Sequence, residues 1–387
     1  MSYFKSAAIL LTMTTLQTGC LESYQPPVVP GDANMLVVDG FLNSVDGTVT
    51  VRLTHSIPLS PEEAAPPELG AFVTLQQDDG SSYDLQEQGE GSYVLNELTV
   101  DTGAQYRLHI RTADSQEYES ALVGIKQTPP IDSLTWRATP EGIYVNVNAH
   151  DDTGLTRYYR WEFSETWQYH AEVTSEFKIV NKKPEYRRAG EFLYTCWDNQ
   201  VSRKITIAST ERLQQDIVSQ LSLIFIPKYS NKISVKYSML VQQWAISKEE
   251  FTFLQRLQKT TENVGSLFDP QPSQVVGNIS SLTNPSSIAL GYFSAGNAHQ
   301  QRLFVDFYDL PDDLQKFPPS IGCQVDSVCA TPLALQCVLN LSDLTGSELL
   351  GSVISREGVV VGFTLSSPNC ADCRTQGGVL TKPDFWP

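Results

Sequence analysis

Soon after its start, the chain alternates apolar and polar residues with the period of two that is typical of β-strands. In the segment Thr48–Thr54, for example, Val49, Val51 and Leu53 fall on one face. Short segments of this kind recur roughly every 8–12 residues, separated by glycine and aspartate turns and without a helical period. This pattern predicts an immunoglobulin-like β-sandwich over residues 35–128.

A second β-rich region begins at the proline pair that follows residue 128 and continues to about residue 310. Its clearest strand patterns lie at 157–169 and 233–246, where aromatic and branched apolar residues alternate with polar ones. We therefore expect a second, sandwich-like β domain over residues 129–310.

One helix interrupts this second region. Ser247 is followed three residues later by Glu250, which is the sequence signature of a capping box at a helix N-terminus. Apolar residues then recur at helical spacing. The expected fold class is therefore mainly β, with an N-terminal immunoglobulin-like sandwich and a second sandwich-like domain that contains a helical insertion near residues 247–264.

Residues 311–387 form a loop-rich segment that contains most of the cysteines of the chain. An even number of cysteines in an exported chain favours disulfides, although the sequence leaves the pairing open. The alternative is a structural metal site built on Cys370 and Cys373 with two upstream thiols, but the upstream spacing is not that of a zinc finger. We expect no metal and no cofactor, and a disulfide-rich tail packed on the second domain. The disulfide candidates are Cys196, Cys323, Cys329, Cys337, Cys370 and Cys373.

The start of the chain has the pattern of an export signal. Lys5 precedes the apolar run Ala7–Leu16, and a glycine directly precedes Cys20. This pattern predicts a signal peptide over residues 1–19 with a small-residue cleavage site. A cysteine directly after the cleavage point resembles the lipobox of bacterial lipoproteins, in which the thiol is acylated. Gln17 stands where the lipobox usually has leucine, and a plain secreted protein whose Cys20 joins a disulfide is the alternative.

Residues 20–34 are rich in proline, which predicts an extended tether ahead of the first domain. The formal net charge of −17 argues against a nucleic-acid partner, because phosphate binding needs dense lysine and arginine. After the leader, no apolar run approaches the roughly 20 residues that a membrane-spanning helix needs. We therefore expect attachment to the outer membrane through an acylated Cys20.

The sequence lacks the motifs of several common catalytic sites: the Gly-x-Ser-x-Gly nucleophile elbow, the His-Glu-x-x-His zinc motif and a phosphate-binding loop. We therefore expect a protein that is not an enzyme. One aromatic and acidic group has the residues of a sugar platform: Trp161, Glu162, Glu165 and Trp167. Alternating aromatic residues on a β-strand first of all pack a core, however, and we favour that interpretation.

Distinctive segments are spread over nearly the whole chain after the leader. They are Val37–Phe41, Gly70–Ala71, Ile131–Leu134, Tyr158–Trp161, Thr195–Trp197, Gln242–Ser247, Gly265–Gln274, Gly277–Ile279, Gly291–Ser294, Cys370–Arg374 and Lys382–Trp386. Together they resemble a family of Bacteroidota outer-membrane lipoproteins, catalogued as domain-of-unknown-function family 4249. The resemblance implies no reaction. It implies an accessory lipoprotein that accompanies a TonB-dependent outer-membrane receptor, with Cys20 as the one residue whose role carries over.

Two short motifs indicate modification after export. Bacteria of this group O-glycosylate exported proteins at motifs of aspartate, then serine or threonine, then an apolar residue. Ser133, in Asp-Ser-Leu, and Ser327, in Asp-Ser-Val, fit this motif and are candidate sites.

These observations lead to one expectation about function. We expect a non-enzymatic lipoprotein at the outer membrane, on its periplasmic face or on the cell surface, that acts as a binding or scaffold subunit of a TonB-dependent transporter or another surface complex. The alternatives are a carbohydrate-binding or glycan-processing surface lipoprotein and a purely structural surface protein.

Overall fold

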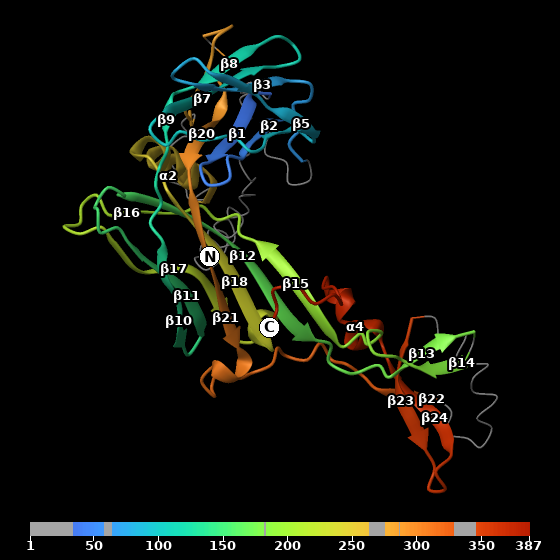
Figure 1. The fold of residues 1–387 in the computed structure, drawn as a ribbon. Helices are drawn as coiled ribbons and strands as arrows, with labels where there is room; N and C mark the ends of the chain where they lie inside the picture. Colours follow the sequence, from blue (N-terminus) through green and yellow to red (C-terminus); the bar gives the residue numbers. More distant parts are fainter. Residues whose placement is uncertain (1–33, 58–63, 182, 263–274, 286, 329–345) are drawn as a thin grey trace, which may run out of the picture.

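The computed structural model describes residues 34–57, 64–181, 183–262, 275–285, 287–328 and 346–387 (Figure 1). Strands dominate these residues, and α2 (Lys248–Glu262) is the longest helix among them, so the prediction of a mainly β fold is confirmed. Within these ranges, no helix is both long enough and apolar enough to cross a membrane. A first β unit lies at one end of the molecule, a second in the middle and a small C-terminal unit at the other end (Figure 1).

The first unit consists of two sheets around one core. One sheet runs, in spatial order, through β20 (Leu290–Gly296), β1 (Leu36–Asn43), β2 (Val49–His55), β6 (Ser92–Leu95) and β5 (Gln86–Gly89). The other runs through β19 (Ile279–Ser281), β8 (Glu117–Ser120), β7 (Gln105–Arg111), β3 (Phe72–Gln77) and β4 (Ser82–Asp84), with β9 (Val123–Gly124) beside β7. Both sheets contribute fully buried side chains, such as Leu53 and Leu108, to the same hydrophobic core. The finer expectation of an immunoglobulin-like arrangement stays a prediction.

The alternation along β2 agrees with the burial of its side chains. Val49, Val51 and Leu53 are 0–1 % exposed, whereas Thr50 and Arg52 face solvent. Burying each of these branched side chains stabilises the fold by about 1.5–3 kcal/mol relative to leaving it exposed. This apolar face therefore explains which side of β2 packs against the other sheet.

Two strands of the first unit come from much later in the chain. β20 pairs in parallel with β1, and Val37 lies opposite Leu290. β19 pairs with β8 at the edge of the other sheet. Phe293 of β20 has no exposed surface and belongs to the core of the first unit. A division of the chain at residue 128, as drawn from the sequence, takes no account of this return of residues 279–296.

Two glycines and one asparagine allow β20 to approach β1 closely. Gly291 has a φ of +107°, and an added Cβ would lie 1.8 Å from the carbonyl oxygen of Val38. Gly277 is equally confined, because its Cβ would lie 1.5 Å from the carbonyl oxygen of Gly291. The Asn278 side chain then takes the place of a strand partner: its Nδ2 donates to Phe293 O at 2.8 Å, and Phe293 N donates to its Oδ1 at 2.9 Å. The backbone at Gly291 therefore requires glycine.

The second unit also has two sheets around one core. One runs through β10 (Ile131–Thr139), β11 (Gly142–His150) and β17 (Ile217–Pro227). The other runs through β15 (Thr195–Val201), β12 (Tyr158–His170), β18 (Lys236–Ala245) and β21 (Ala298–Asp306), with β16 (Thr206–Ser209) also paired to β12. The 3₁₀ turn η1 (Asn231–Ile233) precedes β18, and η2 (Phe307–Asp309) follows β21. Val145, Trp161 and Tyr237 are fully buried in this shared core.

The chain passes from the first unit to the second at two places, and these two crossings lie side by side. We call residues 126–128 and 295–297 the joint. Thr128 N donates to Asn297 Oδ1 at 2.7 Å, and Thr128 Oγ1 donates to Asn297 O at 2.5 Å. The same hydroxyl accepts a hydrogen bond from Ala245 N of β18 at 2.9 Å. The joint is therefore hydrogen-bonded both within itself and to the second unit.

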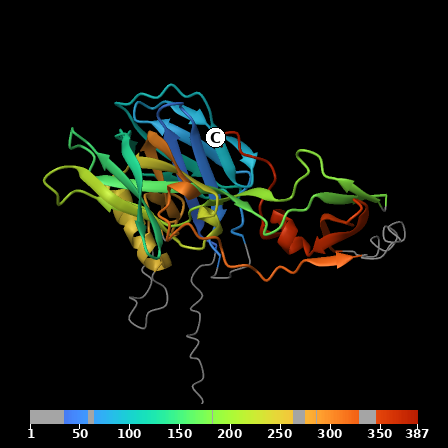
Figure 2. The same ribbon diagram turned by 90° about the horizontal axis from the view of Figure 1, so that it is seen from below.

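The C-terminal unit extends away from the second unit (Figure 2). It contains the hairpin of β13 (Phe177–Val180) and β14 (Lys183–Tyr186) and a sheet in the order β22 (Asp326–Val328), β24 (Val360–Ser366) and β23 (Glu348–Ile354). α4 (Pro368–Ala371) and η4 (Cys373–Gln376) then lead back to the second unit. Its buried core is small and consists of Phe177, Leu349, Phe363 and Leu365.

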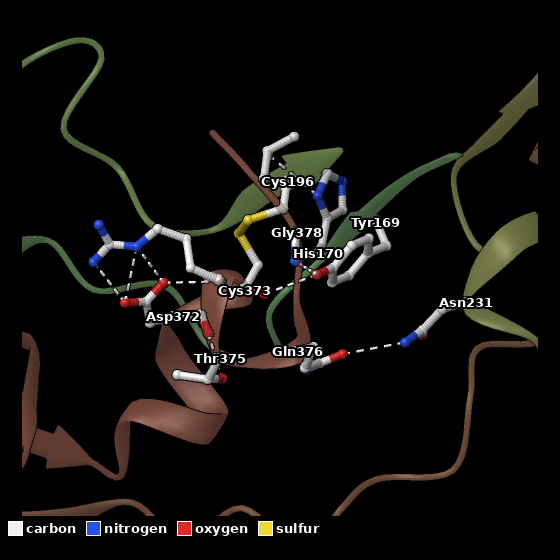
Figure 3. The surroundings of a disulfide bond; sticks show 11 residues. Tyr169, His170, Cys196, Asn231, Asp372, Cys373, Thr375, Gln376 and Gly378 are labelled. Carbon is white, nitrogen blue, oxygen red and sulfur yellow. Dashed lines mark hydrogen bonds and ion pairs between the residues drawn. A yellow bond between two sulfur atoms is a disulfide. The ribbon is translucent and has the colours of Figure 1, made fainter. Parts of the chain in front are cut away.

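Disulfides stabilise this small unit, as the cysteine count predicted. Cys196 bonds to Cys373 and Cys323 bonds to Cys370. The first disulfide joins residues 177 positions apart and ties η4 to β15 (Figure 3), and closing so long a loop strongly restricts the unfolded chain. Because Cys370 and Cys373 each have an upstream disulfide partner, they do not form the metal site considered as the alternative. Three further cysteines, Cys20, Cys329 and Cys337, lie outside the described residues.

We predict that Gly291→Ala destabilises the protein by about 3 kcal/mol or more, because the new Cβ would collide with Val38 O at a φ that favours glycine. Denaturant unfolding followed by tryptophan fluorescence measures this loss. Gly124→Ala is the matched control, since its added Cβ meets nothing within 4 Å and its φ lies outside the left-handed region. Equal stabilities of the two variants would show that β20 does not press on β1 as described.

Candidate functional site

A cleft of about 1070 Å³ lies between the first and second units. Its lining comes from β1 and β2 of the first unit, from β12 and β18 of the second, and from α2 and β20. The lining is mostly apolar, and the volume suits a small organic ligand, since ligand pockets commonly measure about 300–1,000 Å³. The polar and aromatic part of the lining includes Asp39, Arg160, Glu162, Trp244, Glu250 and Tyr292.

The start of α2 directs Glu250 into this cleft. Ser247 caps the helix, because its Oγ accepts a hydrogen bond from Glu250 N at 3.0 Å, as the sequence predicted. The Glu250 carboxylate does not complete the capping box, because it lies 3.8 Å from Nη1 of Arg160 on β12. Ser247 Oγ also contacts Tyr292 Oη of β20 at 3.3 Å. The capping signature therefore located the helix start but not the direction of the Glu250 side chain.

Two carboxylates share one guanidinium in the cleft. Arg160 forms an ion pair with Glu162, two residues further along β12, and a longer one with Glu250. The guanidinium also lies over the Trp244 ring of the neighbouring strand β18, 5.4 Å from the ring centroid. Among the residues that the structure describes, none donates a hydrogen bond to the Glu250 carboxylate, so Arg160 is its nearest charge partner.

Burial changes the acidity of Glu250. Only 6 % of its side chain is exposed, and the resulting desolvation raises the pKa from the ordinary 4.5 to about 7. Asp39 of β1 also raises this pKa, whereas Arg160 and Lys126 lower it. The cleft therefore contains a carboxyl group that changes its charge near neutral pH.

A second buried glutamate has a different environment. Glu165 on β12 is 2 % exposed and accepts hydrogen bonds from Lys232 Nζ and from Tyr237 Oη, each at 2.8 Å. Lys232 in turn lies over the Trp167 ring, 4.8 Å from its centroid. Buried charges are normally satisfied by partners of this kind. Glu165 therefore belongs to the packing of the second unit.

The residues considered as a sugar platform do not come together on a surface. Trp161 has no exposed surface, and its Nε1 donates to Gln243 Oε1 at 2.7 Å. Trp167 is 8 % exposed and belongs to the same core. Glu162 lies on the opposite face of β12, where it lines the cleft. An indole ring without an exposed face cannot stack on a sugar, so the structure favours the core-packing interpretation.

The two candidate glycosylation serines lie on strands. Ser133 of β10 is half-buried, and its Oγ accepts a hydrogen bond from Asn148 Nδ2 at 3.1 Å. Ser327 of β22 is exposed. Neither serine lines the cleft, and their modification stays a prediction.

Sequence reasoning missed Arg160 and Trp244 as parts of a site and recognised Glu250 only as part of a helix cap. Arg160 and Trp244 lie directly opposite each other on β12 and β18, but the sequence does not show which strands pair. Asp39 comes from the other unit, and no local pattern connects it with α2. The available signal was the charged face of β12, where Arg160 and Glu162 stand two residues apart.

The described residues thus define a mainly β protein in which two core-forming units enclose a cleft. The family model described as "Domain of unknown function (DUF4249)" matches residues 22–302. Because this match covers more than half of the chain, the chain belongs to that family, as the sequence resemblance indicated. No curated protein matches the sequence of this chain.

Several solved structures show some similarity to this chain, and one of them is a bacterial adhesin. The adhesin InvE of Yersinia pseudotuberculosis aligns with 86 % of this chain and 75 % of its own, at 11 % sequence identity and a TM-score of 0.16. A similarity of this size supports no conclusion about fold or function.

We predict that Trp167→Ala lowers the free energy of unfolding by about 3–5 kcal/mol, because it leaves a cavity in the core and removes the ring beneath Lys232. Thermal unfolding followed by circular dichroism measures the loss. Trp244→Ala, which truncates a half-buried ring at the cleft, should cost less. An unchanged melting temperature of Trp167→Ala together with lost glycan binding would instead support the sugar platform.

We also predict that Glu250 makes the protein less stable as the pH rises from about 4.5 to 7, and that Glu250→Gln removes this loss. The folded chain holds the Glu250 proton more tightly than the unfolded chain does, so the stabilising effect is present at low pH and is gone above pH 7. A rise of the pKa from 4.5 to about 7 corresponds to about 3 kcal/mol at most.

Urea unfolding at a series of pH values across this window measures the effect. Glu249→Gln, which changes the exposed neighbour on α2, is the matched control and should keep the wild-type pH dependence. If the Glu250→Gln profile ran parallel to that of the wild type, the raised pKa of Glu250 would be refuted.

Proposed function

We propose that this chain is a non-enzymatic lipoprotein of the cell envelope that binds a ligand in the cleft between its two β units and works as an accessory subunit of an outer-membrane transporter of the TonB-dependent type. The observation that carries the binding function is the cleft, which is mostly apolar and has a few charged groups at fixed positions. Pockets of this composition are typical of ligand-binding sites. The anchor and the partner rest on the leader pattern, on Cys20 and on the family resemblance.

The chemistry of the cleft supports binding more than catalysis. Glycoside hydrolysis, the closest enzymatic alternative, needs one carboxyl group to donate a proton and another to attack or to activate water. In the cleft, Arg160 pairs with Glu162 and lies beside Glu250, so neither carboxylate is independent of the guanidinium. A binding role needs only that this arrangement of charges stays fixed.

The position of the first strand supports a cleft near the membrane. Met35, directly before β1, lines the cleft. A tether over residues 20–34 would therefore lead from an acylated Cys20 to the edge of the cleft. At about 3.1 Å per residue of extended chain, the tether would span up to about 45 Å. Such a reach would let the cleft face a transporter in the same membrane.

We expect the native protein, extracted from envelopes with a mild detergent, to begin at an acylated Cys20 and to co-purify with an outer-membrane transporter. Mass spectrometry of the N-terminal peptide and of the co-purified proteins measures both properties. Cys20→Ser, which leaves the rest of the chain unchanged, should abolish the acylation and the membrane association.

Two outcomes would contradict parts of this proposal. A cytosolic protein that retains residues 1–19 would exclude the envelope location. A protein that is acylated but elutes alone at every salt concentration would exclude a stable transporter partner while leaving the anchor intact.

A further inference from the structure

The charged groups of the cleft are matched within the protein. Asp39 of β1 lies directly opposite Arg52 of β2, and opposite charges at such cross-strand positions attract each other. Arg160 pairs with Glu162 and lies 3.8 Å from Glu250. The whole lining has three acidic residues and four basic ones: Asp39, Glu162, Glu250, Arg52, Arg160, Arg203 and Lys204. A ligand therefore gains little from a net charge of either sign.

The first unit contributes an apolar strip to the cleft. Along β1, Val38 and Leu42 enter the core of the first unit, so the alternation of a strand turns Val37 and Phe41 to the opposite face. Both of these side chains line the cleft and keep part of their surface exposed. A sheet face that meets only water normally has polar residues. This face of β1 therefore suits contact with an apolar group.

The other elements around the cleft also contribute apolar side chains. Trp244 of β18 and Phe253 and Leu257 of α2 line it, and each of them is half-buried. Leu254 of α2 and Leu290 of β20 add further aliphatic surface. Removal of apolar surface from water is the main favourable contribution to most association. The binding free energy that this cleft offers therefore comes mainly from apolar contact.

The size of the cleft suits an elongated apolar chain. Its volume of about 1070 Å³ lies at the upper end of the roughly 300–1,000 Å³ that is common for ligand pockets. For a saturated hydrocarbon chain, each methylene group that leaves water strengthens binding about fourfold, and the chain needs no hydrogen-bond partner. A hydrocarbon chain therefore matches both the volume and the lining.

The covalent structure of the protein favours one source for such a group. Met35 lines the cleft, and Cys20 is only 15 positions earlier in the sequence. An extended segment of that length spans up to about 45 Å. Tethering of this kind gives a linked group an effective concentration on the order of millimolar. An acyl chain on Cys20 therefore has a strong advantage over a free lipid of the same chemistry.

Resting on the acylation of Cys20 that is part of the proposed function, we infer that the ligand of the cleft is an acyl chain and that Cys20 of the same protein molecule supplies it. The acyl chain contacts Val37 and Phe41 of the first unit and Phe253 of α2. Arg160 keeps its two carboxylate neighbours, because a hydrocarbon offers them no competing partner.

This contact has a consequence for membrane attachment. A single acyl chain binds a bilayer only marginally and reversibly, so a stable anchor needs a second chain or another signal. A cleft that withdraws one chain of the anchor weakens the attachment, and it shields that chain from water while the protein is away from the membrane. The cleft and the bilayer therefore compete for the same group.

Binding of straight-chain alcohols to Cys20→Ser tests the apolar part of the inference, because this variant leaves the cleft without its own acyl chain. In isothermal titration of the full chain, the affinity should rise about fourfold for each methylene group added from hexanol to decanol. Phe41→Asp in the same background should weaken decanol binding at least about tenfold. Phe72→Asp is the matched control, since Phe72 is 64 % exposed on β3 and does not line the cleft. Unfolding curves verify that both variants are folded.

Cross-linking of the native protein tests the source of the acyl chain. Cells that are fed a palmitate analogue with a diazirine near its end attach it at Cys20, and irradiation then links the acyl chain to the groups that it touches. In acylated protein transferred to detergent-free buffer, mass spectrometry should find links from Cys20 to the peptides that contain Phe41 and Phe253. A mixture of isotopically light and heavy protein distinguishes links within one molecule from links between molecules.

The inference is overturned if no alcohol binds to Cys20→Ser up to its solubility limit, or if the affinity does not depend on chain length. It is also overturned if the alcohols bind but the acyl chain of the native protein links only to other molecules, since the cleft would then take a free apolar ligand. Mass spectrometry of the N-terminal peptide separates these failures from that of the proposed function. An unacylated Cys20 contradicts the anchor, whereas an acylated Cys20 without links to the cleft contradicts this inference alone.

Discussion

The structure depends on the joint, where the chain passes from the first unit to the second at two places and the two passages pair with each other. Thr128 uses its backbone N–H and its hydroxyl on Asn297, and Asn297 is the one residue between β20 and β21. β20 buries Phe293 in the first core, and β21 buries Val305 in the second. A shift of this crossing by one residue would reverse the faces of both strands. The position of this crossing therefore determines which side chains of β20 enter the first core and which side chains of β21 enter the second.

The shape of the cleft depends on the joint as well. Its walls belong to different units, so their separation is set by the joint and by the contacts around it. Gln243 extends those contacts, because its Nε2 donates to Pro129 O at 2.8 Å while its Oε1 accepts from Trp161 Nε1 at 2.7 Å. This buried amide connects the core of the second unit to the first of the two crossings, at residues 126–128. Preorganisation of this kind reduces the entropy that a ligand would lose on binding.

Local sequence patterns predicted single strands and the presence of disulfides, but not which strands or which cysteines pair with each other. The alternation at Val49 and Val51 predicted which face of β2 is buried, and the cysteine count predicted disulfides but not their pairing. The parallel pairing of β1 with β20 was not predicted, since a period of two identifies the buried face of a strand and not its neighbour. For the same reason the sequence did not predict the cleft, because Asp39 and Glu250 come near each other only when β20 returns to the first unit.

The two buried glutamates show why the cleft, and not the core, is the place to look for function. Glu165 is satisfied by Lys232 and Tyr237 at hydrogen-bond distance, so the fold accommodates its charge. Glu250 is buried to a similar degree but shares one guanidinium, and its pKa is raised because the fold stabilises its charge poorly. The helix cap does not require a carboxylate at this position, because Ser247 bonds the backbone N–H and not the side chain. A buried carboxyl group whose charge the fold stabilises poorly, placed in a cleft of ligand size, is the kind of group that marks a candidate functional site.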